Sequence, residues 1–527
     1  MRKMGRWAAP LAAAVSLLRT GAAYGYGVEL PENGTIAFGR AGAVQSTARD
    51  ASGVMHNIAT IGDLRGLQLS IGSNLSSFTH CFQRQGNYDT TANATVNVDG
   101  TRFDPNLMEG NSEPRYAFDS RPTAYPQICK EPGVGLAPMI LGSYRLSNRI
   151  TLGFGIFSPS TQGSAQNFPD TVTARDSMGN SFDAPSPARY LLFRKQLTVL
   201  YPTFGASFNV NRFLRVGAAL HVGFANFQFG LHSNADRTAP QSPSSDVFIG
   251  LNATGILFGF SAGVQVMPLP NLTFGANLRY TAPVDASGEA TTRFNPYGTG
   301  ATPAVDGGFT IDSMRVSLPW NVRASARYHM PRAGRPQQND GTGQYDAATD
   351  DVFDIEATFI YERTSNLSET SLRNTGSINT SLMPVPAPPE LTIRSALADV
   401  IGVRIGGDYN VVPGRLAVRA GFSMESRGAS PDLAQIHLPA YSGMSVHAGA
   451  TYRFGRRVGV SLGFGHFFFN DNNAATAQRA VTVPSPQLDP ATACATSNSI
   501  GAGGCQINRG LYTASMTSGS VALHLFF

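Results

Sequence analysis

The chain has 527 residues, and only 14% of them are Asp, Glu, Lys or Arg, where soluble globular proteins have about 25%. Beyond the N-terminus, no segment has the run of roughly 18 apolar residues that a transmembrane helix requires. The formal net charge of +5 is dispersed rather than clustered with aromatic residues, which argues against nucleic-acid binding. Few charges, 56 glycines and 10% aromatic residues favour a transmembrane β-barrel, whose strands are apolar only at every second position.

The first residues have the pattern of a secretory signal peptide. Basic Arg2 and Lys3 precede an apolar segment over 7–18, and small residues at 21–23 provide a cleavage site. The alternative, an uncleaved anchor, is disfavoured because the apolar segment is too short to cross a bilayer. Residues 1–23 are therefore predicted to be a signal peptide, which implies export of the mature chain.

Four cysteines, Cys81, Cys129, Cys494 and Cys505, lie in two long polar segments. An exported chain meets an oxidising compartment, in which cysteines form disulfides. Because the two members of each pair share one segment, we predict that Cys81 bonds to Cys129 and Cys494 bonds to Cys505. Free thiols are the alternative, and a metal site is not expected because no Cys/His set has the usual ligand spacing.

From residue 64 onward, apolar and polar residues alternate, which predicts β-strands with one kind of side chain on each face. The segment 314–328 is interpreted as one such strand. Its apolar face is expected to carry Met314, Val316, Leu318, Trp320, Val322, Ala324 and Tyr328. Alternation is irregular around Pro202 in the segment 189–208, and a bulge or a kink is expected there.

Short breaks alternate with long polar breaks along the chain, as periplasmic turns alternate with extracellular loops in a bacterial barrel. The segments between breaks predict an all-β fold: an antiparallel transmembrane β-barrel of about fourteen strands over 64–527. The last strand alternates up to Phe527. Such an aromatic end resembles the C-terminal strands that the barrel-assembly machinery recognises, so the expected location is the cell outer membrane.

Residues 24–63 do not alternate and are rich in glycine and small polar residues. A barrel of about fourteen strands encloses a lumen too wide for wall side chains to fill. We therefore predict that residues 24–63 form an N-terminal hatch, or plug, within the barrel. A periplasmic arm outside the barrel is the alternative.

Short motifs follow one another through the N-terminal region. They are Glu32-Asn33-Gly34, Phe38-Gly39-Arg40-Ala41-Gly42-Ala43, Ala48-Arg49-Asp50-Ala51-Ser52, His56-Asn57-Ile58-Ala59 and Leu64-Arg65-Gly66. In this order they resemble the FadL-type family of outer-membrane transporters for long-chain fatty acids and other hydrophobic compounds. The resemblance implies a fourteen-stranded barrel with an N-terminal hatch, and a ligand that leaves sideways through the wall. Asn57 and Ala59 match the family's Asn-Pro-Ala hatch motif, but Ile58 replaces the proline that would fix φ near about −65°.

Alternation assigns several apolar residues to the lumen. A water-filled porin has a polar lumen, so these residues favour a binding site for an apolar ligand. The predicted ligand-binding residues are Phe227, Phe229, Ile249, Leu251, Leu257, Phe467 and Phe469. The alternative is that they pack under external loops or against the hatch.

Charged residues fall on the lumen face of neighbouring strands as well. Arg323 and Arg327 face Asp354 and Glu356 across one turn, within reach of cross-strand pairing. We expect a lumen charge network that fixes the wall or holds the hatch. In a second interpretation, an unpaired arginine binds a substrate carboxylate.

The sequence contains no convincing catalytic site. Ser261 is the centre of a G-x-S-x-G match, but that motif needs a strand-to-helix turn, and Ser261 lies within an alternating segment. We predict no enzyme activity, catalytic residue, metal or cofactor.

The expected function is therefore a passive channel for the uptake of long-chain fatty acids or other hydrophobic compounds. Its expected partners are outer-membrane lipids, a hydrophobic small molecule and the assembly machinery, without nucleic acid, and the chain is expected to be a monomer. The alternative is a surface-exposed structural or recognition barrel without transport activity.

Overall fold

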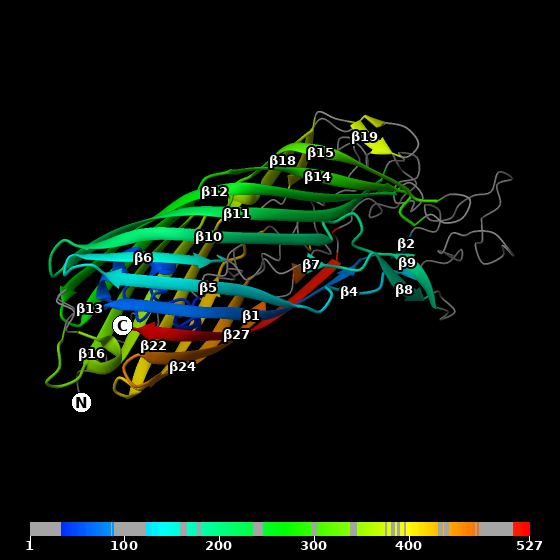
Figure 1. Cartoon of the computed structure of the whole chain (residues 1–527). Coiled ribbons are helices and arrows are strands. Elements are labelled where there is room, and N and C mark those ends of the chain that lie inside the picture. The colour runs from blue at the N-terminus through cyan, green and yellow to red at the C-terminus, as the bar shows by residue number, and fades with distance from the viewer. Residues whose placement is uncertain are drawn as a thin grey trace, which may run out of the picture.

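The computed structural model contains one large closed sheet (Figure 1). It describes residues 33–85, 87–88, 123–158, 166–175, 181–234, 246–297, 303–337, 345–374, 377–380, 385–386, 390–394, 397–429, 436, 442–469, 472–473, 508 and 510–527. The expected signal peptide and the predicted pair Cys494 and Cys505 lie outside these residues. None of the helices described is long and apolar enough to span a bilayer.

Fourteen strand positions form the closed antiparallel barrel, as predicted. Ten positions hold a single strand: β1 (Leu67–Arg84), β5 (Val134–Arg145), β6 (Ile150–Phe157), β10 (Arg194–Asn209), β11 (Leu214–Asn234), β12 (Asp246–Leu269), β23 (Leu416–Glu425), β24 (Gly443–Phe454), β25 (Val458–Phe469) and β27 (Gly510–Phe526). The barrel closes where β1 pairs with β27, from Gln68 beside Phe526 to Arg84 beside Gly510.

The other four positions are each divided into two strands. They are β13 (Leu272–Thr281) with β14 (Val284–Phe294), β15 (Val305–Val316) with β16 (Asn321–Pro331), β17 (Asp351–Glu362) with β18 (Glu369–Arg373), and β21 (Glu390–Arg394) with β22 (Val400–Val412). The breaks lie side by side, because β13 pairs with β16 and β16 with β17, while β14 pairs with β15 and β15 with β18. A row of interruptions therefore crosses this part of the wall.

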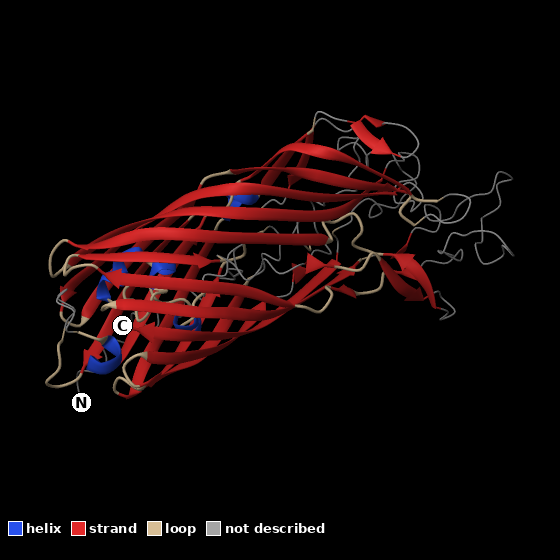
Figure 2. Ribbon diagram, in the orientation of Figure 1, coloured by secondary structure: helices blue, strands red, loops and turns tan. Residues whose placement is uncertain are grey.

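Shorter elements extend or connect the barrel strands. They are β2 (Asn87–Tyr88), β3 (Thr123–Ala124), β4 (Ile128–Cys129), β7 (Gln166–Asn167), β8 (Thr171–Arg175), β9 (Ser181–Pro185), β19 (Ser377–Thr380), β20 (Val385–Pro386) and β26 (Asn472–Asn473). The helical elements are α2 (Thr35–Gly39), α3 (Gly53–His56), η1 (Ile58–Asp63), α4 (Ala347–Asp350) and η5 (Thr364–Leu367). Figure 2 shows how little of the described chain is helical.

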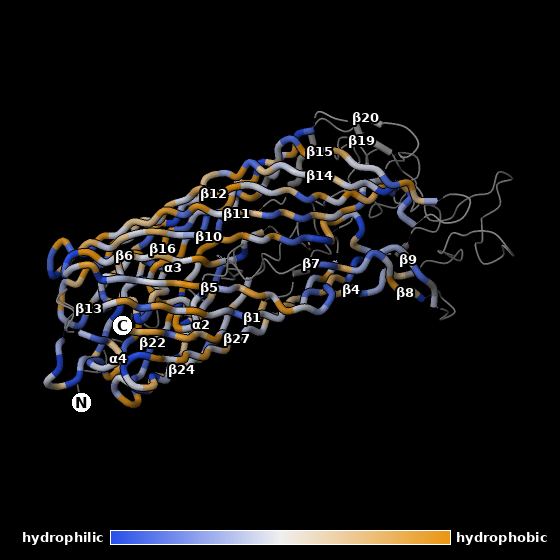
Figure 3. Tube along the Cα trace, in the orientation of Figure 1, coloured by the Kyte–Doolittle hydropathy of each residue, from blue (hydrophilic) through white to orange (hydrophobic). Residues whose placement is uncertain are grey.

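The outer surface of the wall is apolar, and polar residues face the lumen. In β11, Leu220 and Phe224 are 68% and 60% exposed, whereas Arg215 and His221 are buried. Figure 3 shows this interleaving of hydrophobic and hydrophilic residues along the strands. Because successive side chains of a strand point to opposite faces, one row can meet lipid while the next faces the interior.

The segment 314–328 is not one strand, and the predicted face is wrong for its first half. Val322 and Tyr328 face outward as expected, at 37% and 44% exposure. Buried on the lumen side instead are Met314, Val316 and Leu318. Residues 317–320 are not in a strand, and Pro319 has no N–H for a neighbouring strand, so the alternation changes phase there.

Of the two irregularities expected at Pro202, the bulge is absent, and the kink stays a prediction. Within β10 the register against β6 is constant from Tyr201 beside Phe157 to Phe208 beside Ile150. Register shifts lie instead between β12 and β13, β14 and β15, β16 and β17, and β22 and β23. A proline fits a strand wherever its nitrogen is not required as a donor, so irregular alternation did not locate a bulge.

Residues 33–63, called the hatch below, lie inside the barrel at the end where the strands are joined by short turns (Figure 1). Almost every residue of the hatch is buried. Its helix α2 contacts β24 and β25, and η1 contacts β6, β10, β11 and β12. The hatch therefore touches opposite sides of the wall. The predicted bounds 24–63 extend beyond the described residues at their N-terminal side.

Wall glycines allow the hatch backbone to approach closely. A Cβ atom on Gly275 would overlap the backbone of Gln45, and one on Gly421 would overlap the backbone of Arg40 and Ala41. Any side chain at these two positions would occupy the place of the hatch. Glycine is thus required there by the hatch rather than by the strand.

A Gly421→Val substitution should displace the hatch while the wall still forms. We expect the protein to keep the heat-modifiable gel mobility of a folded barrel and to leak small hydrophilic solutes from liposomes faster. The matched control is Ala420→Val, because Ala420 is the exposed neighbour on the outer face of β23. An unchanged leak in Gly421→Val would contradict the close fit.

Candidate functional site

The hatch is anchored to the wall by a buried cluster of ion pairs. A guanidinium nitrogen of Arg40 lies 2.8 Å from Asp354 in β17 and 3.0 Å from Asp408 in β22. A second nitrogen of Arg40 lies 3.6 Å from Glu356. The side chains of all four residues are fully buried. The hatch therefore brings positive charge to a part of the wall that carries carboxylates.

Further arginines surround the same carboxylates. Arg49 of the hatch lies 3.2 Å from Asp354 and 3.4 Å from Asp408. Arg327 in β16 lies 2.6 Å from Asp354 and 2.7 Å from Asp351. Burial alone would lower the pKa of Arg49, but Asp354 and Asp408 raise it above its ordinary value. Arg49 therefore keeps its charge in the lumen.

Hydrogen bonds to the hatch backbone complete the attachment. The backbone N–H groups of Gln45 and Ser46 donate to Glu356 at 2.6 and 2.9 Å. Arg404 of β22 donates to the carbonyl of Ala41 at 3.0 Å. Buried backbone groups need such partners, and the wall provides them.

Of the predicted charge network, the structure brings Arg327, Asp354 and Glu356 together around the hatch. Arg323 is buried on the same face of β16. The sequence interpretation missed Arg40 and Arg49, which lie more than 300 positions before their partners in the chain. Asp408 was also missed, although it lies four residues after Arg404 in β22 and the alternation therefore puts both on the lumen face.

Asn57 of the hatch motif connects three segments. Its side-chain amide donates to Gln45 at 2.7 Å and to Val264 of β12 at 3.0 Å, and its oxygen accepts from the N–H of Ala59 at 3.1 Å. Ile58, in place of the family's proline, is buried with Val54, Ile61, Leu64 and Ala219. The larger side chain thus adds apolar contact where proline would have added rigidity.

On the long-loop side of the hatch, one part of the lumen face is apolar. One continuous cluster of buried side chains extends from Ala51 and Met55 of the hatch to β14, β15 and β18. The predicted residues Phe227, Leu251 and Leu257 belong to this cluster, and Phe229 and Ile249 pack against it. Residues beside the row of breaks add to it, namely Val284, Val316, Leu318, Leu367 and Leu397.

Phe467 and Phe469 belong to a different cluster. Phe467 packs with Phe38 of the hatch and with Met516, and Phe469 packs against them. The His447 ring stands edge-on to both Phe38 and Phe467, at centroid distances of 4.8 and 5.1 Å. These contacts favour the alternative of packing against the hatch for Phe467, whereas Phe469 also packs against the cluster that contains Phe82 and Tyr512.

A further apolar cluster lies at the long-loop end. It includes Phe82, Phe193 and Tyr512 at strand ends, together with Tyr190 and Ile436 from loops. Close by, the predicted disulfide between Cys81 and Cys129 is confirmed and joins β1 to β4. Among the described residues, loop side chains such as Tyr190 and Ile436 thus pack against the strand ends here.

Ser261 lies in the middle of β12, between Ala219 of β11 and Arg279 of β13. No turn into a helix follows it, so the geometry of a nucleophile elbow does not exist at this serine. Among the described residues there is also no group of three His, Cys, Asp or Glu side chains suited to a metal ion.

Comparison with solved structures finds the same architecture elsewhere. A Pseudomonas aeruginosa FadL homologue aligns over 95% of this chain and 99% of its own, with a TM-score of 0.64 and 13% identity. The Ralstonia pickettii toluene transporter TbuX aligns over 94% and 99% (TM-score 0.56, 16% identity), and the Pseudomonas putida toluene transporter TodX over 96% and 98% (TM-score 0.55, 14% identity). The chain has the FadL-type barrel fold. No protein-family model and no curated protein matches its sequence.

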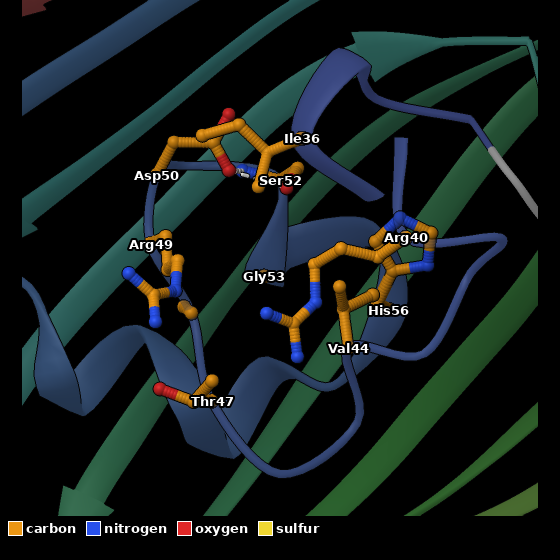
Figure 4. A pocket seen from close by; sticks show the side chains of 10 residues that line it. Ile36, Arg40, Val44, Thr47, Arg49, Asp50, Ser52, Gly53 and His56 are labelled. Atoms are coloured by element: carbon orange, nitrogen blue, oxygen red, sulfur yellow. Dashed lines mark hydrogen bonds between the residues drawn. The ribbon is translucent and has the colours of Figure 1, made fainter. Parts of the chain in front are cut away.

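Within this FadL-type fold, the hatch itself is densely packed. A cavity of about 10 Å³ lies inside it, lined by Arg40, Arg49 and His56 among others (Figure 4). Such a volume holds one water molecule at most. This cavity is therefore too small for a fatty acid or an aromatic hydrocarbon.

Breaking the buried ion cluster should release the hatch. Asp354→Asn leaves Arg40, Arg49 and Arg327 short of a counter-charge, and loss of one buried partner costs about 3–5 kcal/mol. We expect an increased ionic conductance in planar bilayers. Asp306→Asn is the control, since its pair with Arg293 is exposed and worth about 0–1 kcal/mol. Equal conductance of the two variants would show that the cluster does not hold the hatch.

Acid should also loosen the hatch through His56. Burial, and then the charge of Arg323, lower its pKa from 6.5 to about 4. The neutral ring stabilises the docked hatch above pH 6.5, and this contribution is lost as the pH falls towards 4. The released fraction should rise by up to about tenfold per pH unit in that window.

Conductance measured between pH 7 and 4 tests this expectation. The control variant is His56→Gln, because a glutamine amide can still donate to the carbonyl of Asn33, as the His56 ring does at 2.6 Å. Its conductance should depend less on pH in this range. The same pH profile in both proteins would assign the titration to another group.

Proposed function

We propose that this protein is an outer-membrane channel for the passive uptake of long-chain fatty acids or other hydrophobic compounds. The observation that carries the proposal is the apolar cluster on the lumen face, which continues from the upper strands down to Met55 of the hatch. A porin for hydrophilic solutes needs a polar lining. An apolar lining lowers the free energy of an apolar solute that leaves water.

The proposed path begins at the long-loop end, which is extracellular in this orientation. A ligand first contacts the aromatic cluster around Phe82, Phe193 and Tyr512. It then reaches the inner cluster around Phe227 and Leu257. A shift of the hatch, or an opening in the wall, completes the passage, and the concentration gradient supplies the free energy.

The lower half of the lumen supports a regulated rather than an open pore. The hatch lies within it and is held through Arg40 and Arg49 by wall carboxylates. Two of the solved structures with this fold are named as toluene transporters, which is compatible with a small apolar ligand as well as with a fatty acid.

The competing proposal is a recognition or structural barrel without transport. The observation that favours it is the disulfide between Cys81 and Cys129, which joins β4 to β1 at the long-loop end. It gives no reason for the apolar side chains that extend to the hatch. Delivery of a fluorescent long-chain fatty acid into liposomes that contain the purified protein distinguishes the two, because a recognition barrel should not exceed protein-free liposomes.

Uptake should depend on the inner cluster and not on the outer wall. Phe227→Ala combined with Leu257→Ala removes apolar area worth about 25 cal/mol per Å² to a ligand that contacts it. We expect slower uptake of a fluorescent long-chain fatty acid, with the gel mobility of a folded barrel retained. The control is Leu220→Ala, since Leu220 is 68% exposed on the outside of β11.

Phe467→Ala gives the contrasting result. Because Phe467 packs on Phe38 of the hatch, its loss should raise the leak of small hydrophilic solutes more than it lowers uptake. If the inner-cluster variants and Leu220→Ala reduce uptake equally, the inner cluster is structural and the proposed ligand path is wrong.

A further inference from the structure

A second cavity lies at the short-turn end of the barrel, on the other side of the hatch from the apolar cluster. Its volume is about 940 Å³, within the range of small-molecule sites, about 300–1,000 Å³. Its walls come from the hatch at 47–49 and 63, from residues 64–65 that follow it, from the segment 345–349, and from the turns that follow β22 and β24. None of the residues that line it belongs to the predicted ligand-binding set.

Arginines dominate the polar lining of this cavity. They are Arg49, Arg65, Arg415, Arg453, Arg456 and Arg457, beside two aspartates, Asp63 and Asp346. The aspartates are already engaged: Asp63 with Arg215 of β11, and Asp346 with Arg453 at 3.1 Å. The cavity therefore has more positive charge than its own carboxylates neutralise.

Three of these arginines are available to a ligand. Arg415 lies in the turn between β22 and β23, and Arg456 and Arg457 lie in the turn between β24 and β25. All three are exposed. Within the described part of the chain, none of them forms an ion pair. Like charges held together repel one another unless an anion joins them.

Arginines of this cavity affect the pKa of Asp346. Burial alone would raise the pKa of Asp346, but Arg453, a hydrogen bond from the N–H of Ala348, and Arg65 together lower it below its ordinary value. The cavity thus stabilises negative charge on its own side chain, as it would on a bound anion.

The same cavity has an apolar side. Leu64, Phe526 and Phe527 line it, and the guanidinium of Arg453 lies 4.8 Å from the centre of the Phe526 ring. Arginines for a charged group and aromatic rings for a hydrocarbon chain are thus combined in one concave site. A small inorganic anion would use only the arginines.

We propose that this cavity binds an anionic amphiphile, whose carboxylate or phosphate group pairs with Arg415, Arg456 and Arg457 and whose alkyl chain lies against Phe526. In the proposed orientation the site opens to the periplasm. Arg49 lines the cavity and also pairs with Asp354 and Asp408, so a bound anion lies close to an arginine that holds the hatch. The site does not depend on the proposed uptake function, because binding can occur without passage.

Equilibrium binding to the full-length protein in dodecyl maltoside tests the proposal. Hexyl phosphate, hexanoate, hexanol and inorganic phosphate are the probes, followed by ³¹P or ¹H line broadening on titration. We expect both hexyl anions to bind more tightly than hexanol and inorganic phosphate. The combined variant Arg456→Gln and Arg457→Gln should weaken hexyl phosphate by about tenfold or more, as the loss of a charge-assisted hydrogen bond does.

The matched control changes two arginines at the same end of the barrel but outside this cavity, Arg149→Gln with Arg212→Gln. Both are exposed, in the turns before β6 and β11. If the control pair weakens hexyl phosphate binding equally, the effect comes from the net charge of the protein, and the proposed site is wrong. Inorganic phosphate bound as tightly as hexyl phosphate would overturn the amphiphile.

The inner-cluster variant Phe227→Ala with Leu257→Ala separates this site from the proposed function. It should slow fatty acid uptake and leave hexyl phosphate binding unchanged. Loss of hexyl phosphate binding in that variant would place the ligand in the lumen and refute the cavity. A protein that binds the hexyl anions but transports nothing would support this site while the uptake function fails.

Discussion

Carboxylates that face a closed lumen must find cations, and this requirement governs how the molecule is assembled. Asp354 and Asp408 point inward from β17 and β22 and are fully buried. Arg40 and Arg49 of the hatch bring the positive charge that these carboxylates need. A buried ion pair adds little net stability, because desolvation offsets its attraction, but it penalises every arrangement that leaves one partner alone. The cluster therefore favours a single docked position of the hatch.

The polarity of the lumen residues differs between the part of the wall that contacts the hatch and the part beyond it. Two neighbouring strands are polar where they meet the hatch and apolar beyond it: β11 carries Arg215 and then Phe227, and β12 carries Gln265 and then Leu251. The place of a residue in the alternation sets whether it faces lipid or the lumen. In β11 and β12, its position along the barrel axis relative to the hatch sets whether a lumen residue is polar or apolar. The row of breaks reinforces the upper half, because it turns residues such as Leu318 and Leu367 towards the interior.

The sequence was sufficient for the architecture, since alternation and the spacing of the breaks are local properties. The strand number and the lumen face of Phe227 and Leu251 followed from them. Two expectations failed at prolines. A strand was extended across Pro319, and a bulge was placed at Pro202, although proline interrupts pairing only when its nitrogen is needed as a donor.

The attachment of the hatch could be predicted only in part. The alternation of apolar and polar residues assigned the wall carboxylates and arginines to the lumen. It could not assign their partners Arg40 and Arg49, because the hatch has no such alternation. The separation of Phe467 from Phe227 was likewise out of reach, because both are inward aromatic residues near strand ends. Which of them touches the hatch depends on how far along the lumen each one lies, which alternation does not report.

The length of chain between the hatch and its partners has a consequence for the order of folding. Arg40 precedes Asp354 by 314 residues and Asp408 by 368. Contacts so distant in sequence form late, since the loop between them must first be closed. The N-terminal segment, which is synthesised first, cannot be seated until β17 and β22 are in place. Glycines such as Gly275 and Gly421 leave the space that the hatch backbone needs, so a wall with a side chain at either position could not accept the hatch even after β17 and β22 have formed.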